Sequence, residues 1–247
     1  MKKLLAFITL ALLASALIWC IGCDGSSSGD DDDDDDDEGE CPDTNLDIAV
    51  CALDAGPFSL TIDNEFFPLV VGAQLVLEGE DDGETIRVEI NVLEETEDVA
   101  GVTTRVVTET EYEDGELVEV SWNWFAQAPD GTVCYFGEGV DIYEDGEVIS
   151  HDGAWRAGED GALPGIIMPG DPQVGQVFYQ EYYEGVAMDS SEIYAFGEEI
   201  DVPAGTFDDT LTALDYNELE GECEGERKVY ISGIGLAIDE EAELISY

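Results

Sequence analysis

Two segments near the middle of the chain alternate between apolar and polar side chains. Residues 85–93 and residues 117–124 both follow this period of two, and their apolar positions hold mainly valine, isoleucine or tryptophan. Such alternation predicts half-buried β-strands. In the second segment the predicted inward side chains are Val118, Val120, Trp122 and Trp124, and the predicted outward ones are Glu119, Ser121 and Asn123.

Asp-Gly dipeptides punctuate this part of the chain. They occur at Asp82-Gly83, Asp114-Gly115, Asp130-Gly131 and Asp145-Gly146. The dipeptide between alternating strands is a strong hairpin signal, because glycine readily adopts the positive φ that a two-residue turn requires. Residues 74–149 are therefore predicted to form a meander of adjacent antiparallel strands. Further strands are predicted at 177–183, 192–196, 199–202, 206–216, 227–232 and 236–245.

The predicted fold class is mostly β, a single antiparallel β-meander that forms a curved sheet or half-barrel with little helix. A short helix is considered only near residues 44–53. Residues 152–176 interrupt the strand pattern with three prolines and six glycines. A long irregular loop in a compact domain is often functional, so this segment is expected to form a rim or lid over the concave face.

The first 22 residues have the composition of a signal peptide. Lys2 and Lys3 precede an uncharged apolar run over residues 4–21, which is short for a permanent membrane span. The run ends in Cys20-Ile21-Gly22-Cys23, which resembles the lipobox of bacterial lipoproteins. The resemblance implies a lipid on Cys23 that anchors the protein to a membrane of the cell envelope, facing outside the cytoplasm. The inner and the outer membrane are both open alternatives.

An acidic segment follows the predicted lipid site. Asp30 to Asp37 form an unbroken run of aspartates, which repel one another and bury nothing. Residues 23–40 are therefore predicted to be a lipidated cysteine and a disordered tether. The acidic antiparallel β domain is predicted to span residues 41–247.

Four cysteines remain in the predicted domain: Cys41, Cys51, Cys134 and Cys223. An even number of cysteines in an exported domain predicts two disulfides, for which three connectivities exist. We favour a local Cys41–Cys51 bond and a long-range Cys134–Cys223 bond. The spacing lacks the Cys-x-x-Cys or Cys/His clusters of a zinc site.

Charge limits the partners of this protein. The chain has 61 acidic and 7 basic residues, and its formal net charge is −54 at pH 7. Such a surface repels nucleic acid and anionic lipid headgroups, so nucleic-acid binding is excluded. Most carboxylates lack a basic partner and are expected to be solvated. Binding of Ca²⁺ or other cations is an alternative use of the same charge.

The sequence offers little evidence for a catalytic site. His151 is the sole histidine and precedes Asp152, but no Gly-x-Ser-x-Gly nucleophile motif occurs in the chain. Carboxylate pairs suited to glycoside hydrolysis arise by chance at this acid content. We therefore predict a protein that is not an enzyme and has no cofactor.

Large apolar side chains suggest a different role. Aromatic residues are concentrated in the middle strands and around residues 152–176, where they form either an aromatic core or the lining of an apolar pocket. The candidate ligand-binding residues are Trp122, Trp124, Tyr135, Trp155, Met168 and Tyr179.

Several short segments resemble exported bacterial proteins of uncharacterised function. These are Val202-Pro203-Ala204-Gly205-Thr206-Phe207, the segment Tyr230 to Leu236, Tyr135-Phe136-Gly137-Glu138 and Met168-Pro169-Gly170. Some such proteins are similar in plan to Lol-type lipoprotein carriers, an antiparallel half-barrel open to an apolar ligand. The resemblance implies a binding module for an apolar or lipid-like ligand, and it transfers no site residue.

Overall fold

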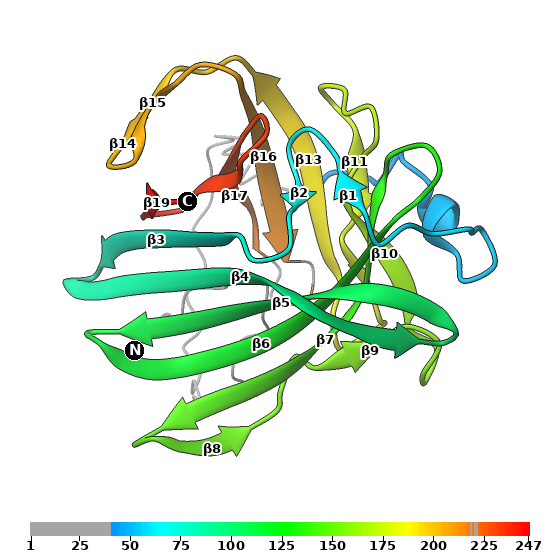
Figure 1. Cartoon of the computed structure of the whole chain (residues 1–247), viewed down its shortest axis with the longest axis horizontal. Coiled ribbons are helices and arrows are strands. Elements are labelled where there is room, and N and C mark those ends of the chain that lie inside the picture. Colours follow the sequence, from blue (N-terminus) through cyan, green and yellow to red (C-terminus); the bar gives the residue numbers. More distant parts are fainter. Residues whose placement is uncertain (1–40, 218, 220–221) are drawn as a thin grey trace, which may run out of the picture.

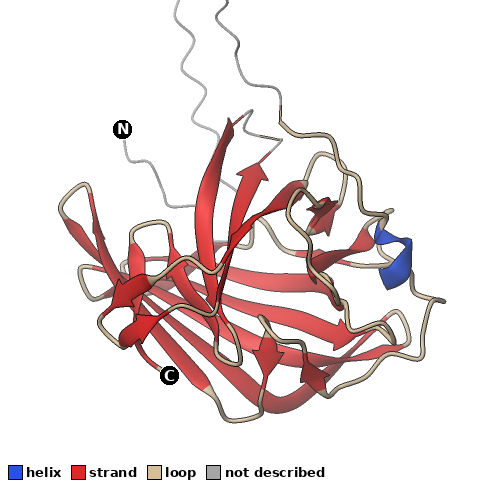
Figure 2. Cartoon of the chain, turned by 90° about the horizontal axis from the view of Figure 1, so that it is seen from above, coloured by secondary structure: helices blue, strands red, loops and turns tan. Residues whose placement is uncertain are grey.

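The computed structural model describes residues 41–217, 219 and 222–247. Nearly all of its regular structure is strand, with one short 3-10 helix at the periphery (Figures 1 and 2). In chain order the elements are η1 (Ile48–Cys51), β1 (Ile62–Asp63), β2 (Pro68–Leu69), β3 (Gln74–Asp81), β4 (Glu84–Val99), β5 (Val102–Glu113), β6 (Glu116–Gln127), β7 (Val133–Glu144), β8 (Glu147–Ser150), β9 (Trp155–Arg156), β10 (Leu163–Met168), β11 (Val177–Tyr179), β12 (Glu181–Tyr182), β13 (Asp189–Phe196), β14 (Ile200–Val202), β15 (Gly205–Phe207), β16 (Thr210–Asn217), β17 (Glu222–Ile231), β18 (Gly235–Asp239) and β19 (Ala242–Ser246).

One antiparallel sheet organises the molecule. Its strand order is β11-β13-β16-β17-β18-β19-β3-β4-β5-β6-β7-β10-β12, and β8 and β9 also pair with β7. The sheet curves until it is nearly closed into a barrel, which confirms the predicted mostly β meander (Figure 1). Three predicted turns join neighbouring strands, and their aspartates Asp82, Asp114 and Asp145 have φ of 48°, 49° and 53°. Positive φ at both turn residues matches the twist of the flanking strands.

The two ends of the sheet meet at one residue. Gln180 lies between β11, which pairs with β13, and β12, which pairs with β10. Its backbone N–H donates to the carbonyl of Asp189 at 2.8 Å. Gly165 in β10 permits this approach, because a Cβ there would lie 2.0 Å from the Gln180 carbonyl oxygen. The two ends of the sheet therefore meet at the bend between the short strands β11 and β12.

The segment 152–176 differs from its prediction as a loop. It contains β9 and the buried strand β10, which lies between β7 and β12 in the barrel wall. Pro164 is tolerated because β10 lies near the end of the sheet and has a register irregularity between Ile166 and Met168. This segment is therefore largely wall, and the prediction of a lid was wrong for β10.

The core fills one end of the barrel with aromatic side chains. The ring of Tyr135 stacks on Phe125 with centroids 4.8 Å apart and meets Trp155 edge-on at 5.3 Å. A second apolar cluster lies under the β14–β15 hairpin, where Ile200 and Val202 pack with residues of β17. The Val202–Phe207 motif seen in the sequence is thus the tip and second strand of this hairpin.

Both disulfides differ from the favoured pairing. Cys51 bonds to Cys134, and Cys41 bonds to Cys223. Cys41 and Cys51 are close in sequence, but the chain between them runs along the sheet, and the Asn45 N–H donates to the carbonyl of Val177 at 2.8 Å. The helix η1 then carries Cys51 into the core beside β7. Two disulfides indicate an exported protein.

The predicted signal peptide, the lipid on Cys23 and the tether over residues 23–40 lie outside the described residues. Within the residues that the structure describes, none of the helices has the length and apolar character needed to cross a membrane.

We expect peptide mapping without reduction to recover Cys51 linked to Cys134. The bond closes a loop of 83 residues, for which chain entropy predicts a contribution of about 4–5 kcal/mol. The double variant Cys51→Ser/Cys134→Ser should lower the free energy of unfolding by about that amount in urea titrations. A peptide that links Cys41 to Cys51 would contradict this connectivity.

Candidate binding site in the barrel interior

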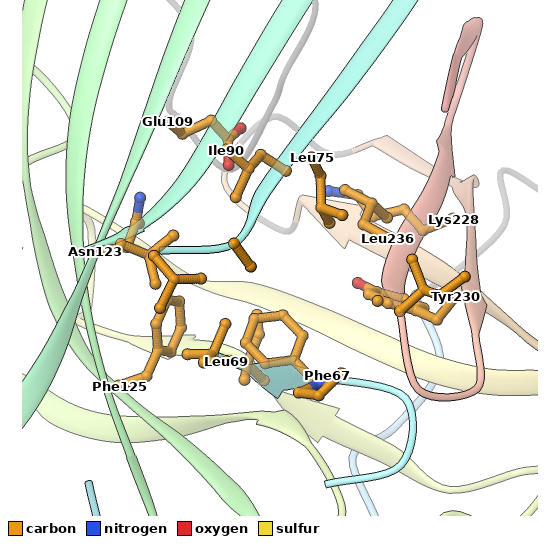
Figure 3. Close-up of a pocket in the computed structure, with 17 residues that line it drawn as sticks. Phe67, Leu69, Leu75, Ile90, Glu109, Asn123, Phe125, Lys228, Tyr230 and Leu236 are labelled. Carbon is orange, nitrogen blue, oxygen red and sulfur yellow. The ribbon is translucent and has the colours of Figure 1, made fainter. Parts of the chain in front are cut away.

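A pocket of about 70 Å³ lies inside the barrel (Figure 3). One wall comes from β3 to β6, and the opposite wall comes from β17, β18 and the turn that joins them. The lining residues are Phe67, Pro68, Leu69, Ala73, Leu75, Ile90, Val92, Val107, Glu109, Asn123, Phe125, Ile167, Lys228, Tyr230, Ile234, Gly235 and Leu236. Most of them are apolar, and the polar groups are few.

Strand register places the polar groups of the first wall. Ile90 of β4 lies opposite Glu109 of β5, and Val107 lies opposite Asn123 of β6. Since side chains alternate between the two faces of a strand, these residues all point inward. Glu109 and Asn123 thus face the same space as the aliphatic side chains of β4.

The face predicted for β6 was wrong. Glu119, Ser121 and Asn123 are buried, and Asn123 lines the pocket. The tryptophans Trp122 and Trp124 therefore lie on the opposite, outer face. The prediction failed because it assumed an apolar interior, whereas this part of the barrel interior is polar.

Lys228 carries a buried positive charge on the second wall. Its Nζ lies 3.4 Å from Asp215 Oδ2 and 3.4 Å from Asp239 Oδ2. Lys228 and Asp239 are each only 2% exposed. Burial lowers the pKa of Lys228, but Asp239 and Asp215 outweigh burial, so the net pKa is raised and the ammonium persists. Burial raises the pKa of Asp239 to about 6 and Lys228 opposes the rise, so this carboxyl is ionised at neutral pH.

Glu109 brings a titratable carboxyl to the pocket itself. Burial, reinforced by the charge of Asp239 and opposed by Lys228, raises its pKa to about 7. At neutral pH this carboxyl is therefore divided between its protonated and ionised forms. It can donate or accept a hydrogen bond at little cost.

More carboxyls surround Glu109 in the interior. Glu111 of β5 lies directly opposite Glu119 of β6, an arrangement that is unfavourable when both are charged. Burial, then Glu119 and Glu109, raise the pKa of Glu111 well above its usual value. Burial and the neighbouring Glu181 do the same for Glu138. Burial therefore favours the protonated form of these carboxyls, and a nearby positive charge would favour the ionised form.

Glu181 has a partner in the aromatic core. It accepts a hydrogen bond from Trp155 Nε1 at 3.1 Å, and burial raises its pKa well above the usual value. The Tyr135 hydroxyl donates to Asn123 Oδ1. Hydrogen bonds thus connect the pocket wall at Asn123 to the aromatic core beneath it.

The ligand-binding residues predicted from sequence lie outside the pocket lining. Tyr135, Trp155 and Met168 are buried in the core, where each packs against other side chains. Tyr179 is half-buried, and its ring contacts Tyr182 with centroids 5.0 Å apart. Neither these four residues nor the outer-face Trp122 and Trp124 are among the lining residues.

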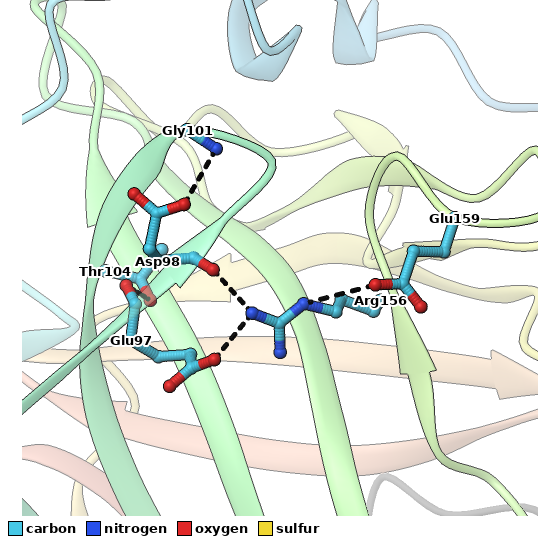
Figure 4. Close-up of polar contacts among 6 residues, drawn as sticks. All are labelled: Glu97, Asp98, Gly101, Thr104, Arg156 and Glu159. Atoms are coloured by element: carbon cyan, nitrogen blue, oxygen red, sulfur yellow. Dashed lines mark hydrogen bonds and ion pairs between the residues drawn. The ribbon is translucent and has the colours of Figure 1, made fainter.

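Trp124 takes part in a structural contact on the outer face. The Arg156 guanidinium lies 4.7 Å from the centroid of its ring. The same guanidinium bonds to Glu97 at 2.6 Å, to the Asp98 carbonyl and to Glu159 (Figure 4). This cluster ties β9 to the β4–β5 hairpin, and Trp124 lies beneath it.

Sequence reasoning missed Glu109, Asn123 and Lys228. One signal was present, because Lys228 is one of five basic residues after the leader and is followed directly by Val229 and Tyr230. A lysine at the start of an apolar strand segment is unusual in so acidic a chain. Glu109 has no comparable signal, since it is one acid among 61.

We expect the protein to lose stability as pH rises from 5 to 8. A carboxyl whose folded pKa is raised binds its proton more tightly in the folded state, so its stabilising effect is lost as pH rises through that pKa. For Glu109 this window runs from 4.5 to about 7. Thermal unfolding should show a lower Tm at pH 8 than at pH 5, and Glu109→Gln should reduce the difference. The exposed Glu116→Gln is the control, and a Tm that rises over this range would contradict the account.

Comparison with protein-family models, curated proteins and solved structures finds no match to this chain. The similarity in plan to Lol-type carriers stays a prediction.

Proposed function

We propose that this protein is an exported, non-enzymatic binding protein of the cell envelope, anchored through a lipid on Cys23. It takes a small apolar or amphiphilic molecule into the barrel interior. The observation that supports this proposal is a pocket whose lining is apolar except for Glu109, Asn123, Lys228 and the Tyr230 hydroxyl. A mainly apolar lining with a few polar groups is typical of small-molecule sites.

Exposed apolar side chains lie beside the pocket lining. Leu69 and Ala73 line it, and Val70 and Val71 between them are 66% and 47% exposed. The backbone of this turn is fixed to β4, because the Gly72 N–H donates to the carbonyl of Val92 at 2.9 Å. Exposed valines beside an apolar pocket favour entry of a molecule that is itself partly apolar.

Volume limits the ligand. A cavity of roughly 150 Å³ binds benzene in a well-studied case, and this pocket has about half of that. A short aliphatic group fits, and a whole lipid chain requires the barrel to open. We therefore favour a small molecule, or one end of a larger one, over a carried lipid.

Two alternatives find less support. An acid–base enzyme separates the pKa values of its two carboxyls, whereas Glu109, Glu111, Glu138 and Glu181 are all shifted upward. For calcium, no group of three or more His, Cys, Asp or Glu in the described residues is placed to hold a metal ion.

We expect n-butanol, a small amphiphilic probe, to bind in the pocket. Amide NMR spectra should shift first at the lining residues of β4, β5 and β18. Val107→Phe places a ring in the pocket and should weaken binding at least tenfold, although overpacking costs about 1–3 kcal/mol of stability. Val120→Phe on the outer face of β6 is the matched control. Unchanged affinity in a folded Val107→Phe variant would refute the site.

A further inference from the structure

Acids outnumber bases inside this barrel. Among the described residues, Lys228 is the only lysine or arginine that is almost wholly buried. Its charge is already matched by Asp215 and Asp239. Four other acids of the interior, Glu109, Glu111, Glu138 and Glu181, have raised pKa values, and none of them forms an ion pair of this kind in the described part of the chain. The interior therefore has room for more positive charge.

Glu138 is the strongest sign of a missing partner. It is 2% exposed, and neither of its carboxyl oxygens has a hydrogen-bond partner of good geometry in the described part of the chain. The nearby Tyr135 hydroxyl, which favours the ionised form of Glu138, gives its proton to Asn123. Glu119 and Glu181 face Glu138 and repel its charge. Buried polar atoms are rarely left unpaired in proteins, so this carboxyl calls for an explanation.

The unpaired carboxyl of Glu138 lies next to a lining residue of the pocket. Glu138 of β7 is the cross-strand partner of Asn123, which lines the pocket. Glu109, Asn123 and Lys228 lie at one end of the pocket, whereas Phe67, Leu69 and Phe125 lie at the other (Figure 3). The pocket thus has a polar end, where Glu109 is the acidic lining residue, and an apolar, aromatic end (Figure 3).

Resting on the proposed function, we infer that the ligand is an organic cation, a small alkylammonium. Its apolar part lies among the aromatic and aliphatic side chains, and its ammonium faces Glu109 with Glu138 behind. The pocket would then bind a defined class of ligand, and the unpaired interior carboxyls would have the role of binding its positive charge.

The side chain of Lys228 already shows how this interior can hold an ammonium group. Its ammonium is held in the same interior by two carboxylates at 3.4 Å, in a nearly dry environment. A ligand ammonium would make the same kind of contact with the acids on the opposite wall. The rings of Phe67 and Phe125, at the other end of the pocket, would contact the apolar part of the ligand (Figure 3).

A metal ion fits these acids less well. Calcium needs six to eight oxygen ligands converging on one point. No such group of three or more acids converges among the described residues. An ammonium needs only one or two carboxylates and an apolar neighbour, which is what the pocket offers.

Binding should release protons. When the ammonium enters, the protonated fraction of Glu109 gives its proton to water and the resulting carboxylate pairs with the cation. Glu109 has a pKa of about 7, so affinity should rise from pH 6 to pH 8, where an alkylamine is still protonated.

The test compares n-butylammonium, n-butanol and butyrate on the full domain at pH 8 by amide NMR titration. We expect butylammonium to bind at least tenfold more tightly than butanol, and butyrate to bind more weakly than either. Glu109→Gln and Glu138→Gln should each reduce the butylammonium-to-butanol ratio at least threefold. Glu116→Gln, an exposed acid at the start of β6, is the control and should leave the ratio unchanged.

Glu138→Gln removes an unpaired buried carboxyl and should raise the Tm. A lower affinity of this variant for butylammonium would therefore not be due to loss of the fold. A butylammonium-to-butanol affinity ratio near one, or a ratio that both variants leave unchanged, would overturn the inference of an organic cation. If butanol still bound in the pocket, the proposed function would stand. Displacement of butylammonium by Ca²⁺ at about 1 mM would also overturn it. If none of the three probes shifted the amide signals of the lining residues, the proposal that this pocket binds ligands would be refuted.

Discussion

The desolvation of carboxyl groups inside a nearly closed barrel governs this structure. Taking a charge out of water is costly unless it is paired or neutralised. Lys228 pairs with Asp215 and Asp239, and loss of such a buried base would leave two uncompensated carboxylates at a cost of about 3–5 kcal/mol. Glu109, Glu111, Glu138 and Glu181 respond instead with raised pKa values. The barrel interior thus holds carboxyl groups whose environment favours either protonation or a nearby cation.

The two ends of the interior have different uses. The aromatic core of Phe125, Tyr135 and Trp155 supplies apolar burial, and the Cys51–Cys134 bond fixes η1 against it. The polar region contributes little to stability at neutral pH, because burial disfavours the ionised form of its carboxyls. A stability cost confined to one pocket-facing region is commonly associated with function. This contrast is the physical basis for placing a binding site between the two ends.

Much of the fold could be predicted from the sequence. Alternation in β4 and the Asp-Gly turns gave the meander, because both signals are local. The inward face of β6 could not be predicted, since Glu119 and Asn123 point into a polar interior that only closure creates. Disulfide pairing failed for a similar reason, because the path of residues 42–50 is set by contacts with β11. The pocket joins strands distant in sequence, so its residues carried no local signature apart from Lys228.

The protonation state of Glu138 tests this account most directly. Side-chain carboxyl ¹³C NMR can follow the group through a pH titration without added ligand. We expect the pKa of Glu138 to lie well above that of a free glutamate, and we expect n-butylammonium to lower this pKa while n-butanol leaves it unchanged. A Glu138 carboxyl that titrates like a free glutamate, with a pKa that butylammonium leaves unchanged, would contradict the claim that the barrel interior favours an added cation.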